Sequence, residues 1–275
     1  MTAIDELPPT PEDGPAREQR GIQSVEVGGQ LLIALAHQGR AMPLKELARE
    51  AGMAPAKAHP YLVSFNKLGL IEQDRDTGWY GLGRLALQLG LMALQQTDPV
   101  RVSTPLLPEL ALQVGHTIGV AVWGNRGPTI VHVSESPAVV HVNMRHGTVF
   151  SISDTASGRL YAALQPTKAL QALYEQERQT LDRALPAWDA FYAELDDIRR
   201  HGVSRVEGAV TAGVSAMSAP VYDHRGQLVV AITAIGPSAS FDHRFNGPVA
   251  QALKATAAAV TQRLGGRRPA EPAPG

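Results

Sequence analysis

The sequence predicts an α+β protein of two domains, in which a helix connects a small helical domain to a larger domain built on an antiparallel sheet. Up to residue 83, apolar residues recur at the spacing of one helix face, and a short turn-rich segment follows. Beyond Pro99, helical stretches interrupt strand-like runs, with a hairpin at either end. The expected divisions are a disordered tail over 1–20, the helical domain over 21–83, the connecting helix over 84–98, the larger domain over 99–264 and a second disordered tail over 265–275.

The composition is typical of a soluble globular protein. The chain has 275 residues, of which 44% are hydrophobic, and a formal net charge of −1. No apolar run approaches the roughly 20 residues that a membrane span needs, and the acidic, proline-rich start lacks a signal-peptide pattern. The absence of cysteine excludes disulfides and thiolate metal sites. We therefore expect a cytoplasmic protein, in which any affinity for nucleic acid depends on local charge.

Three amphipathic helices are expected in the first domain. The first has Ser24 as its expected N-cap and ends near Gly39. The second stops at Gly52, the third ends at Gly69, and a hairpin then turns within residues 74–78. This order of elements is the layout of a winged helix-turn-helix, although any small helical domain with a hairpin would show the same pattern.

The third helix has a charge pattern that favours DNA binding. Between residues 54 and 68 it carries Lys57, His59 and Lys67 and no acidic residue. Because a helix without carboxylates approaches phosphates without repulsion, we interpret it as the helix that would contact DNA.

The same helix contains Pro60, which costs about 3 kcal/mol inside a helix but little in the first turn. We therefore expect the helix to begin late, near Ala56 or Lys57, rather than to bend at Pro60. A late start moves the expected DNA contacts toward Lys57, Tyr61 and Ser64. The full set of expected DNA-binding residues is Lys57, His59, Tyr61, Ser64 and Lys67.

The connecting helix has two apolar stripes. One stripe includes Leu85 and Leu89, and the other includes Leu87 and Leu91. Such a helix must be covered on both sides. It is either an ordinary core helix or a linker that packs on its own domain and on a partner subunit.

The larger domain combines strands with helices. Strands are expected at 117–123, 129–134, 139–142, 149–152, 216–222 and 227–235. Helices are expected near 104–114, 159–164, 167–174 and 188–201, and a last helix has its stripe between Val249 and Leu264. This alternation predicts an antiparallel sheet with helices packed on it.

Short motifs recur in a characteristic order along the chain. They are Leu47-Ala48, Gly52-Met53, His59, Leu62, 68–72, Tyr80, Leu82-Gly83, Arg145, Gly147, Thr155-Ala156, Gly158, Gly213-Val214, Ala219-Pro220-Val221, Asp223 and Gly236-Pro237. Through these residues the chain resembles the IclR-type bacterial transcription regulators over roughly residues 21–264. The resemblance implies a homodimer or a dimer of dimers that binds double-stranded operator DNA, without a cofactor, and is controlled by a small organic effector bound to a GAF-like domain. Dimerisation favours the linker interpretation of the connecting helix.

The resemblance also implies where the effector binds, between the sheet and the loop that begins the helix at 159–164. The implied effector-binding residues are Thr155, Ala156, Ser157, Gly158, Glu207, Ala216, Thr233 and Ile235. The sequence departs from the family pattern in having Asp154 where a small residue is common, Ala216 in place of cysteine, and Thr233 and Ile235 in place of serines. We therefore expect an effector that is less acidic, or more apolar, than the short oxoacids of some relatives.

Residues 155–158 open a helix, and this suggests two alternatives. Backbone N–H groups at a helix start have no partner within the helix and form a natural anion site. Alternatively, Ser153 or Thr155 merely caps the helix.

The sequence gives no support for a catalytic or metal site. It contains no Gly-x-Ser-x-Gly elbow, no Walker loop and no His-Glu-x-x-His motif. His132, His141 and His146 lack ligands at suitable spacing, so we interpret them as surface or hydrogen-bonded histidines. We expect a DNA-binding regulator and not an enzyme. The alternative is a small-molecule-binding or enzymatic α+β domain attached to a helical module that does not bind DNA.

Overall fold

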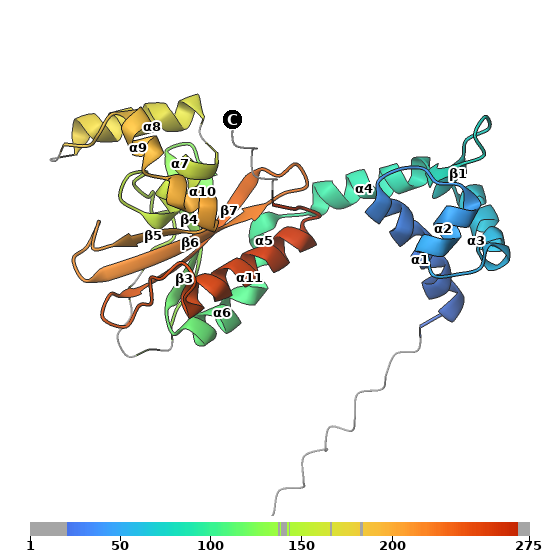
Figure 1. The fold of residues 1–275 in the computed structure, drawn as a ribbon. Coiled ribbons are helices and arrows are strands. Elements are labelled where there is room, and N and C mark those ends of the chain that lie inside the picture. The colour runs from blue at the N-terminus through green and yellow to red at the C-terminus, as the bar shows by residue number, and fades with distance from the viewer. Residues whose placement is uncertain are drawn as a thin grey trace, which may run out of the picture. The chain divides into compact units, whose positions relative to one another are not determined.

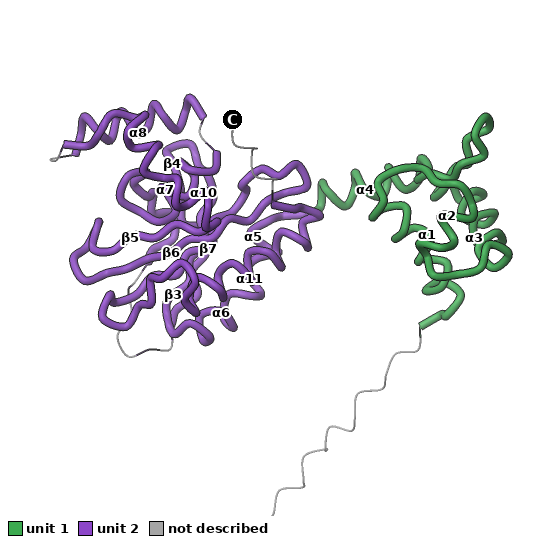
Figure 2. The backbone as a smooth tube through the Cα atoms, in the orientation of Figure 1, with its two compact units in different colours: residues 1–96 green, residues 97–275 purple. Residues whose placement is uncertain are grey.

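The computed structural model describes residues 21–136, 138, 142, 144–165, 167–181 and 184–268. The chain forms two compact units, unit 1 over residues 1–96 and unit 2 over residues 97–275 (Figure 2). The predicted tail over 1–20 lies outside the described residues, as do residues 269–275 of the second predicted tail.

Unit 1 contains the three predicted helices, α1 (Gln23–Gln38), α2 (Leu44–Glu50) and α3 (Pro55–Leu68), packed around one apolar core (Figure 1). Gly39 and Gly69 end α1 and α3 in the left-handed conformation, with φ of 65° and 76°. The prediction that Ser24 caps α1 is wrong, because the N-cap position belongs to Ile22 and no side chain caps the helix.

Helix α3 begins earlier than predicted. Pro55 occupies its first turn, and the N–H groups of Lys57 and Ala58 both donate to the carbonyl of Ala54 at 3.0 Å. Proline suits the first turn because its fixed φ is helical and its missing N–H has no helical partner there. Pro60 consequently lies inside the helix, and the predicted late start is wrong. The hydroxyl of Ser64 donates to the carbonyl of Pro60 at 3.0 Å.

The predicted hairpin is present and consists of β1 (Ile71–Gln73) and β2 (Tyr80–Leu82), paired antiparallel. The Asp74 carboxylate stabilises the turn by accepting hydrogen bonds from the N–H groups of Thr77 at 2.7 Å and Asp76 at 3.1 Å. Three helices followed by this hairpin complete the winged helix-turn-helix.

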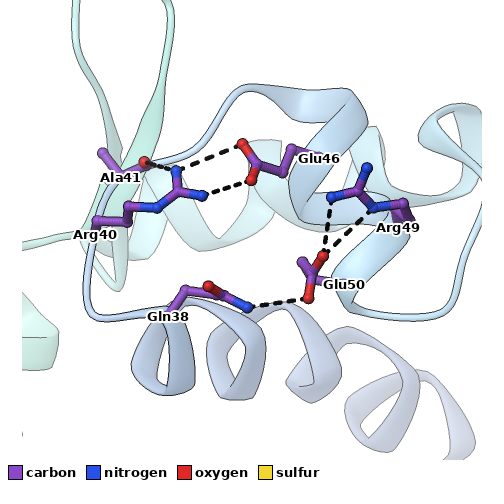
Figure 3. A network of polar contacts seen from close by, with 6 residues as sticks. All are labelled: Gln38, Arg40, Ala41, Glu46, Arg49 and Glu50. Carbon is purple, nitrogen blue, oxygen red and sulfur yellow. Dashed lines mark hydrogen bonds and ion pairs between the residues drawn. The ribbon is translucent and has the colours of Figure 1, made fainter.

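A polar network connects the end of α1 to α2 (Figure 3). Arg40 pairs with Glu46 at 2.6 Å, Arg49 pairs with Glu50 at 3.1 Å, and Gln38 donates to Glu50 at 3.0 Å. The two arginines of this region thus face carboxylates, in contrast to the lysines of α3, a helix that has no acidic residue.

Helix α4 (Arg84–Gln96) follows the hairpin, and none of its residues is buried. Leu85 is half-buried, whereas five other large apolar side chains are exposed, namely Leu87, Leu89, Leu91, Met92 and Leu94. The structure therefore rejects the interpretation of this segment as an ordinary core helix.

Unit 2 is built on a five-stranded antiparallel sheet of order β4-β3-β7-β6-β5, with helices on both faces (Figure 1). One face packs on α6 and α11, and the other on α7 and α10, while α8 and α9 add to the apolar cluster on the second side. The strands are β3 (Thr117–Gly124), β4 (Gly127–Ser134), β5 (Ser204–Glu207), β6 (Val214–Tyr222) and β7 (Leu228–Pro237). The helices are α5 (Pro99–Ser103), the 3-10 turn η1 (Thr104–Leu106), α6 (Leu107–Val114), α7 (Ala156–Leu164), α8 (Lys168–Thr180), α9 (Trp188–Ala193), α10 (Asp196–His201) and α11 (Pro248–Arg263).

The structure corrects several predicted elements of unit 2. The predicted strand at 149–152 is only an isolated bridge between Val149 and Thr129. Strand β5 was not predicted, and most of the predicted strand at 139–142 lies outside the described residues. Residues 265–268 are not a free tail, since the Arg268 guanidinium donates to the carbonyl of Arg199 at 3.2 Å. Among the residues that the structure describes, none of the helices combines the length and apolar character that a membrane span requires.

Candidate functional sites

Helix α3 has a buried face and an exposed face. Ala58 and Leu62 are fully buried in the core of unit 1. Four of the five residues predicted to bind DNA are exposed, namely Lys57, His59, Ser64 and Lys67. The cations of α3 are thus available at the surface of unit 1.

Tyr61, the fifth predicted residue, does not lie on the exposed face. It packs against the core of unit 1, where Gly28 of α1 gives it room. A Cβ atom added at Gly28 would lie 2.8 Å from Cδ1 of Tyr61. Tyr61 precedes the buried Leu62 by one residue, so it borders the core face, and a larger residue at position 28 would displace it.

The exposed face of α3 includes residues that the sequence analysis did not select. Ala56, Pro60, Val63 and Asn66 are all exposed. Because side chains three or four residues apart share a helix face, extending the helical period to the side opposite Ala58 would have identified Ala56, Pro60 and Val63. Asn66 lies four residues after the buried Leu62, so the helical period alone would not have identified it.

Unit 2 contains a cavity of about 530 Å³ between the start of α7, strands β6 and β7, and the segments at 142–151 and 206–214. Six of the eight predicted effector-binding residues line it. They are Thr155, Ala156, Ser157, Ala216, Thr233 and Ile235. A volume of this order suits a small organic molecule.

Gly158 does not line the cavity and has a packing function instead. A Cβ atom at this position would lie 2.1 Å from the carbonyl oxygen of Ser151, so only glycine fits. Its N–H donates to Oγ1 of Thr155 at 3.0 Å. Thr155 therefore caps α7, as the second alternative for this helix start proposed, and the Gly158 N–H is already bonded within the protein.

Glu207 also lies outside the cavity. Neighbouring residues of a strand point to opposite faces, and it is Val206 of β5 that lines the cavity. The Glu207 carboxylate lies 3.5 Å from Nε2 of His243, and it borders a different cavity with Arg159 and Arg205.

Buried hydroxyl groups fix the wall of the cavity. Thr233 of β7 donates to Oγ of Ser218 at 2.8 Å, and its oxygen lies 2.7 Å from Oγ of Ser157. Because the Thr233 proton is directed to Ser218, Ser157 is the donor in the second contact. Ser204 donates to the carbonyl of Ala156 at 2.5 Å. These bonds connect the start of α7 to three strands of the sheet.

The loop that precedes α7 is held by Glu177 of α8. The Glu177 carboxylate accepts hydrogen bonds from the N–H groups of Ile152 at 2.6 Å and Ser153 at 3.1 Å. The hydroxyls of Ser151 and Ser153 also donate to it, each at 3.1 Å. Ser151 itself lines the cavity, so Glu177 positions part of the cavity wall from outside.

The cavity lining also includes residues outside the predicted effector-binding set. Met144, Phe150 and Val214 contribute apolar surface, whereas Arg145 and Asp154 contribute opposite charges. Met144 and Phe150 come from an irregular segment, which carries no periodic signal in the sequence.

The histidines that the structure describes show no metal-binding arrangement. Within the described part of the chain, no three side chains of His, Asp or Glu lie close enough together to hold a metal ion. The rings of His132 and His146 meet edge to face with centroids 6.1 Å apart. His141 lies outside the described residues.

Comparison with known proteins identifies the family. Residues 24–75 match the IclR helix-turn-helix domain, and residues 91–262 match the C-terminal domain of the bacterial transcriptional regulator IclR. The glycerol operon regulatory protein of Streptomyces griseus is 30% identical over 252 residues, which is 90% of this chain and 99% of the relative. That of Streptomyces coelicolor is 28% identical over 90% of this chain and 99% of the relative.

A solved structure agrees with this assignment. The crystal structure of Pseudomonas aeruginosa HmgR is 36% identical, with a TM-score of 0.83, over 89% of this chain and 99% of that chain. The winged helix-turn-helix of unit 1 and the cavity-bearing α+β domain of unit 2 correspond to the two matched domains. The chain therefore belongs to the IclR family of DNA-binding bacterial transcription regulators.

Proposed function

We propose that this protein binds a palindromic operator as a homodimer, or as a dimer of dimers, and that a small organic effector bound in unit 2 controls this binding. The observation that carries the DNA-binding part is the exposed face of α3, which presents Lys57, His59 and Lys67 without an acidic residue on the helix. Cations at such a surface displace counterions from DNA phosphates. Because its target is DNA, the protein would act in the cytoplasm.

The exposed apolar stripes of α4 support self-association. Leu87 is 64% exposed, Leu89 54% and Leu91 50%. A row of leucines in water is unfavourable, and a second copy of the same helix would remove it from solvent. A twofold assembly also presents two copies of α3 to two operator half-sites.

The cavity of unit 2 supports the effector part of the proposal. Its apolar side chains favour a ligand with an apolar body, while the Thr211 hydroxyl is available to a polar substituent and Ser157 keeps only its oxygen as an acceptor. Asp154 and Arg145 bring opposite charges to the lining, so together they favour neither an acidic nor a basic ligand. We therefore propose a small, mainly apolar organic compound as the effector, and a catabolic operon as the target.

Operator selection tests the DNA-binding part directly. A randomised duplex pool is incubated with the full chain, and bound DNA is amplified and sequenced. Each lysine that contacts a phosphate contributes about 0.9 to the slope of log affinity against log salt concentration. In a dimer bound to both half-sites, Lys57→Gln combined with Lys67→Gln removes two lysines from each of two subunits. We therefore expect this double variant to lower the slope by about 4, with Lys168→Gln in unit 2 as the control. A slope that is unchanged in the double variant would contradict the proposed contacts.

Compound screening tests the effector part. Candidate compounds are added to the operator complex, and release is followed by mobility shift and by thermal stabilisation of unit 2. Glycerol is included because two relatives are named as glycerol operon regulators. Chemical turnover of a compound by a protein that selects no DNA would favour the alternative, an enzymatic α+β domain.

A further inference from the structure

The exposed face of α3 carries an apolar stripe in addition to its cations. Ala56, Pro60 and Val63 are all exposed, at spacings of four and three residues that place them on one side of the helix. Val63 is 40% exposed. The stripe lies opposite Ala58 and Leu62, which are fully buried, so the core of unit 1 does not use it.

Hydrogen-bond donors are scarce along this stripe. Pro60 has no N–H, and the Ser64 hydroxyl already donates to the Pro60 carbonyl at 3.0 Å. The hydroxyl oxygen of Ser64 remains an acceptor, but its proton is engaged. The centre of the exposed face therefore presents carbon atoms rather than donors to whatever it contacts.

The surroundings of the stripe favour DNA over a protein as its occupant. Lys57 and Lys67 lie near the two ends of α3, and the helix has no carboxylate. A positive rim around a narrow apolar stripe complements a polyanion that carries apolar groups between its phosphates. In the major groove, the 5-methyl group of thymine is such a group.

We propose that Val63 reads thymine, by packing its methyl groups against thymine 5-methyl groups in the major groove, with Pro60 extending the same contact. This inference rests on the proposed function, because it requires α3 to lie in the groove. It assigns base selection at the centre of each half-site to an apolar contact rather than to a bidentate hydrogen bond. Burial of one methyl group changes affinity by about fourfold.

Replacement of thymine by deoxyuridine isolates this contact, because deoxyuridine pairs identically and lacks only the methyl group. Each thymine of a selected operator is replaced in turn, and the affinity of the full chain is measured. We expect about a fourfold loss at one or two positions of each half-site. For Val63→Ala, we expect a clearly smaller preference for thymine over deoxyuridine at those positions, because the two valine methyl groups are lost and mainly Pro60 remains.

A matched control is Val25→Ala, which removes the same atoms from a valine of α1 that is 67% exposed. This variant should retain the fourfold preference for thymine, and both variants should keep the melting temperature of unit 1.

If no DNA is selected, the proposed function fails, and this inference fails with it. If operators are selected but deoxyuridine has no effect at any position, only the inference is overturned. Dissociation of the oligomer by Val63→Ala would instead show that the stripe binds protein, and would also overturn it.

Discussion

The two functional regions of this protein are built in opposite ways. The exposed residues of α3 lie at the surface of unit 1, and the core beneath them consists of Leu31, Leu62 and other buried residues on the opposite side. In unit 2, the residues that line the cavity are themselves parts of the folded interior, as Ser157 and Thr233 are both buried and hydrogen-bonded to each other. Function and stability are therefore separable in unit 1 and coupled in unit 2.

The largest separation of function from stability is expected at α4. Leu91→Glu places a carboxylate in the proposed apolar interface, where its desolvation is unfavourable. We expect a monomer whose operator affinity falls more than about 100-fold, because two linked half-site contacts become independent. The melting temperature of unit 1 should not fall, since Leu91 is 50% exposed in the single chain.

Sedimentation and operator titration measure these two effects, with Gln88→Glu on the same exposed helix as the control. An oligomer that survives Leu91→Glu together with Leu87→Glu would place the subunit contact outside α4.

Ser157→Trp is the strongest test of the coupling between function and stability in unit 2. The indole would occupy the cavity, and the hydrogen bond to Thr233 would be lost. We expect the effector response to disappear and the free energy of unfolding of unit 2 to fall by about 1–3 kcal/mol, as for other overpacked sites. Operator affinity without effector should be retained, because α3 belongs to the other unit.

Mobility shift with and without the effector, together with chemical denaturation, checks both effects of Ser157→Trp. A variant that responds to the effector with normal affinity would place the ligand elsewhere.

Glu177→Gln should produce a smaller effect of the same kind. The amide keeps one acceptor oxygen but loses the charge that binds two N–H groups and two hydroxyls of the loop at 151–153. Hydrogen bonds to charged groups contribute about 1.5–3 kcal/mol each, and the retained oxygen preserves part of this. We expect unit 2 to lose about 1–2 kcal/mol, with faster hydrogen exchange at Ile152 and Ser153.

Glu175→Gln is the matched control for Glu177→Gln, because Glu175 lies on the same helix and pairs with Arg178 at 2.7 Å near the surface. Equal losses of stability in the two variants would contradict a specific function of Glu177 in holding the loop.

The sequence predicted the elements whose apolar pattern is long or whose ends carry clear signals. Helices α1 and α3 have apolar stripes and a terminal glycine, and β6 and β7 are long, mainly apolar runs. Strand β5 was missed because its four residues are Ser-Arg-Val-Glu, which is short and mostly polar. Without that strand, the alternation that places Val206 at the cavity and Glu207 away from it could not be predicted.

The sites were predicted less completely because they depend on contacts between distant residues. Six cavity residues followed from the family resemblance, whereas Glu177 lies 24 residues after Ser153 and had no local signal. Tyr61 is half-buried because it borders the core face, and its contact with Gly28 on another helix had no local signal in the sequence. The start of α3 was misjudged because the cost of Pro60 inside a helix was given more weight than the preference of a proline such as Pro55 for a first helical turn.

The smallest expected effect comes from His116, a histidine of unit 2 that is buried and stacked on Phe241 with ring centroids 4.6 Å apart. Burial lowers the pKa of His116, and a hydrogen bond with the Ser240 backbone only partly opposes this. In the unfolded chain, the pKa of histidine is about 6.5. Above that pH the side chain is neutral in both states and the stability is fully present, whereas below it the unfolded chain takes up a proton that the folded protein excludes. Unit 2 should therefore lose stability as the pH falls below about 6.5, at no more than about 1.4 kcal/mol per pH unit from this one group.

His116→Gln should remove that part of the pH dependence, and His37→Gln, which changes an exposed histidine of α1, should leave it in place. Hydrogen exchange of α11 and of α1, measured between pH 7.5 and 5.5, would separate the two units, and an unchanged pH dependence in His116→Gln would show that other groups determine the acid sensitivity of unit 2.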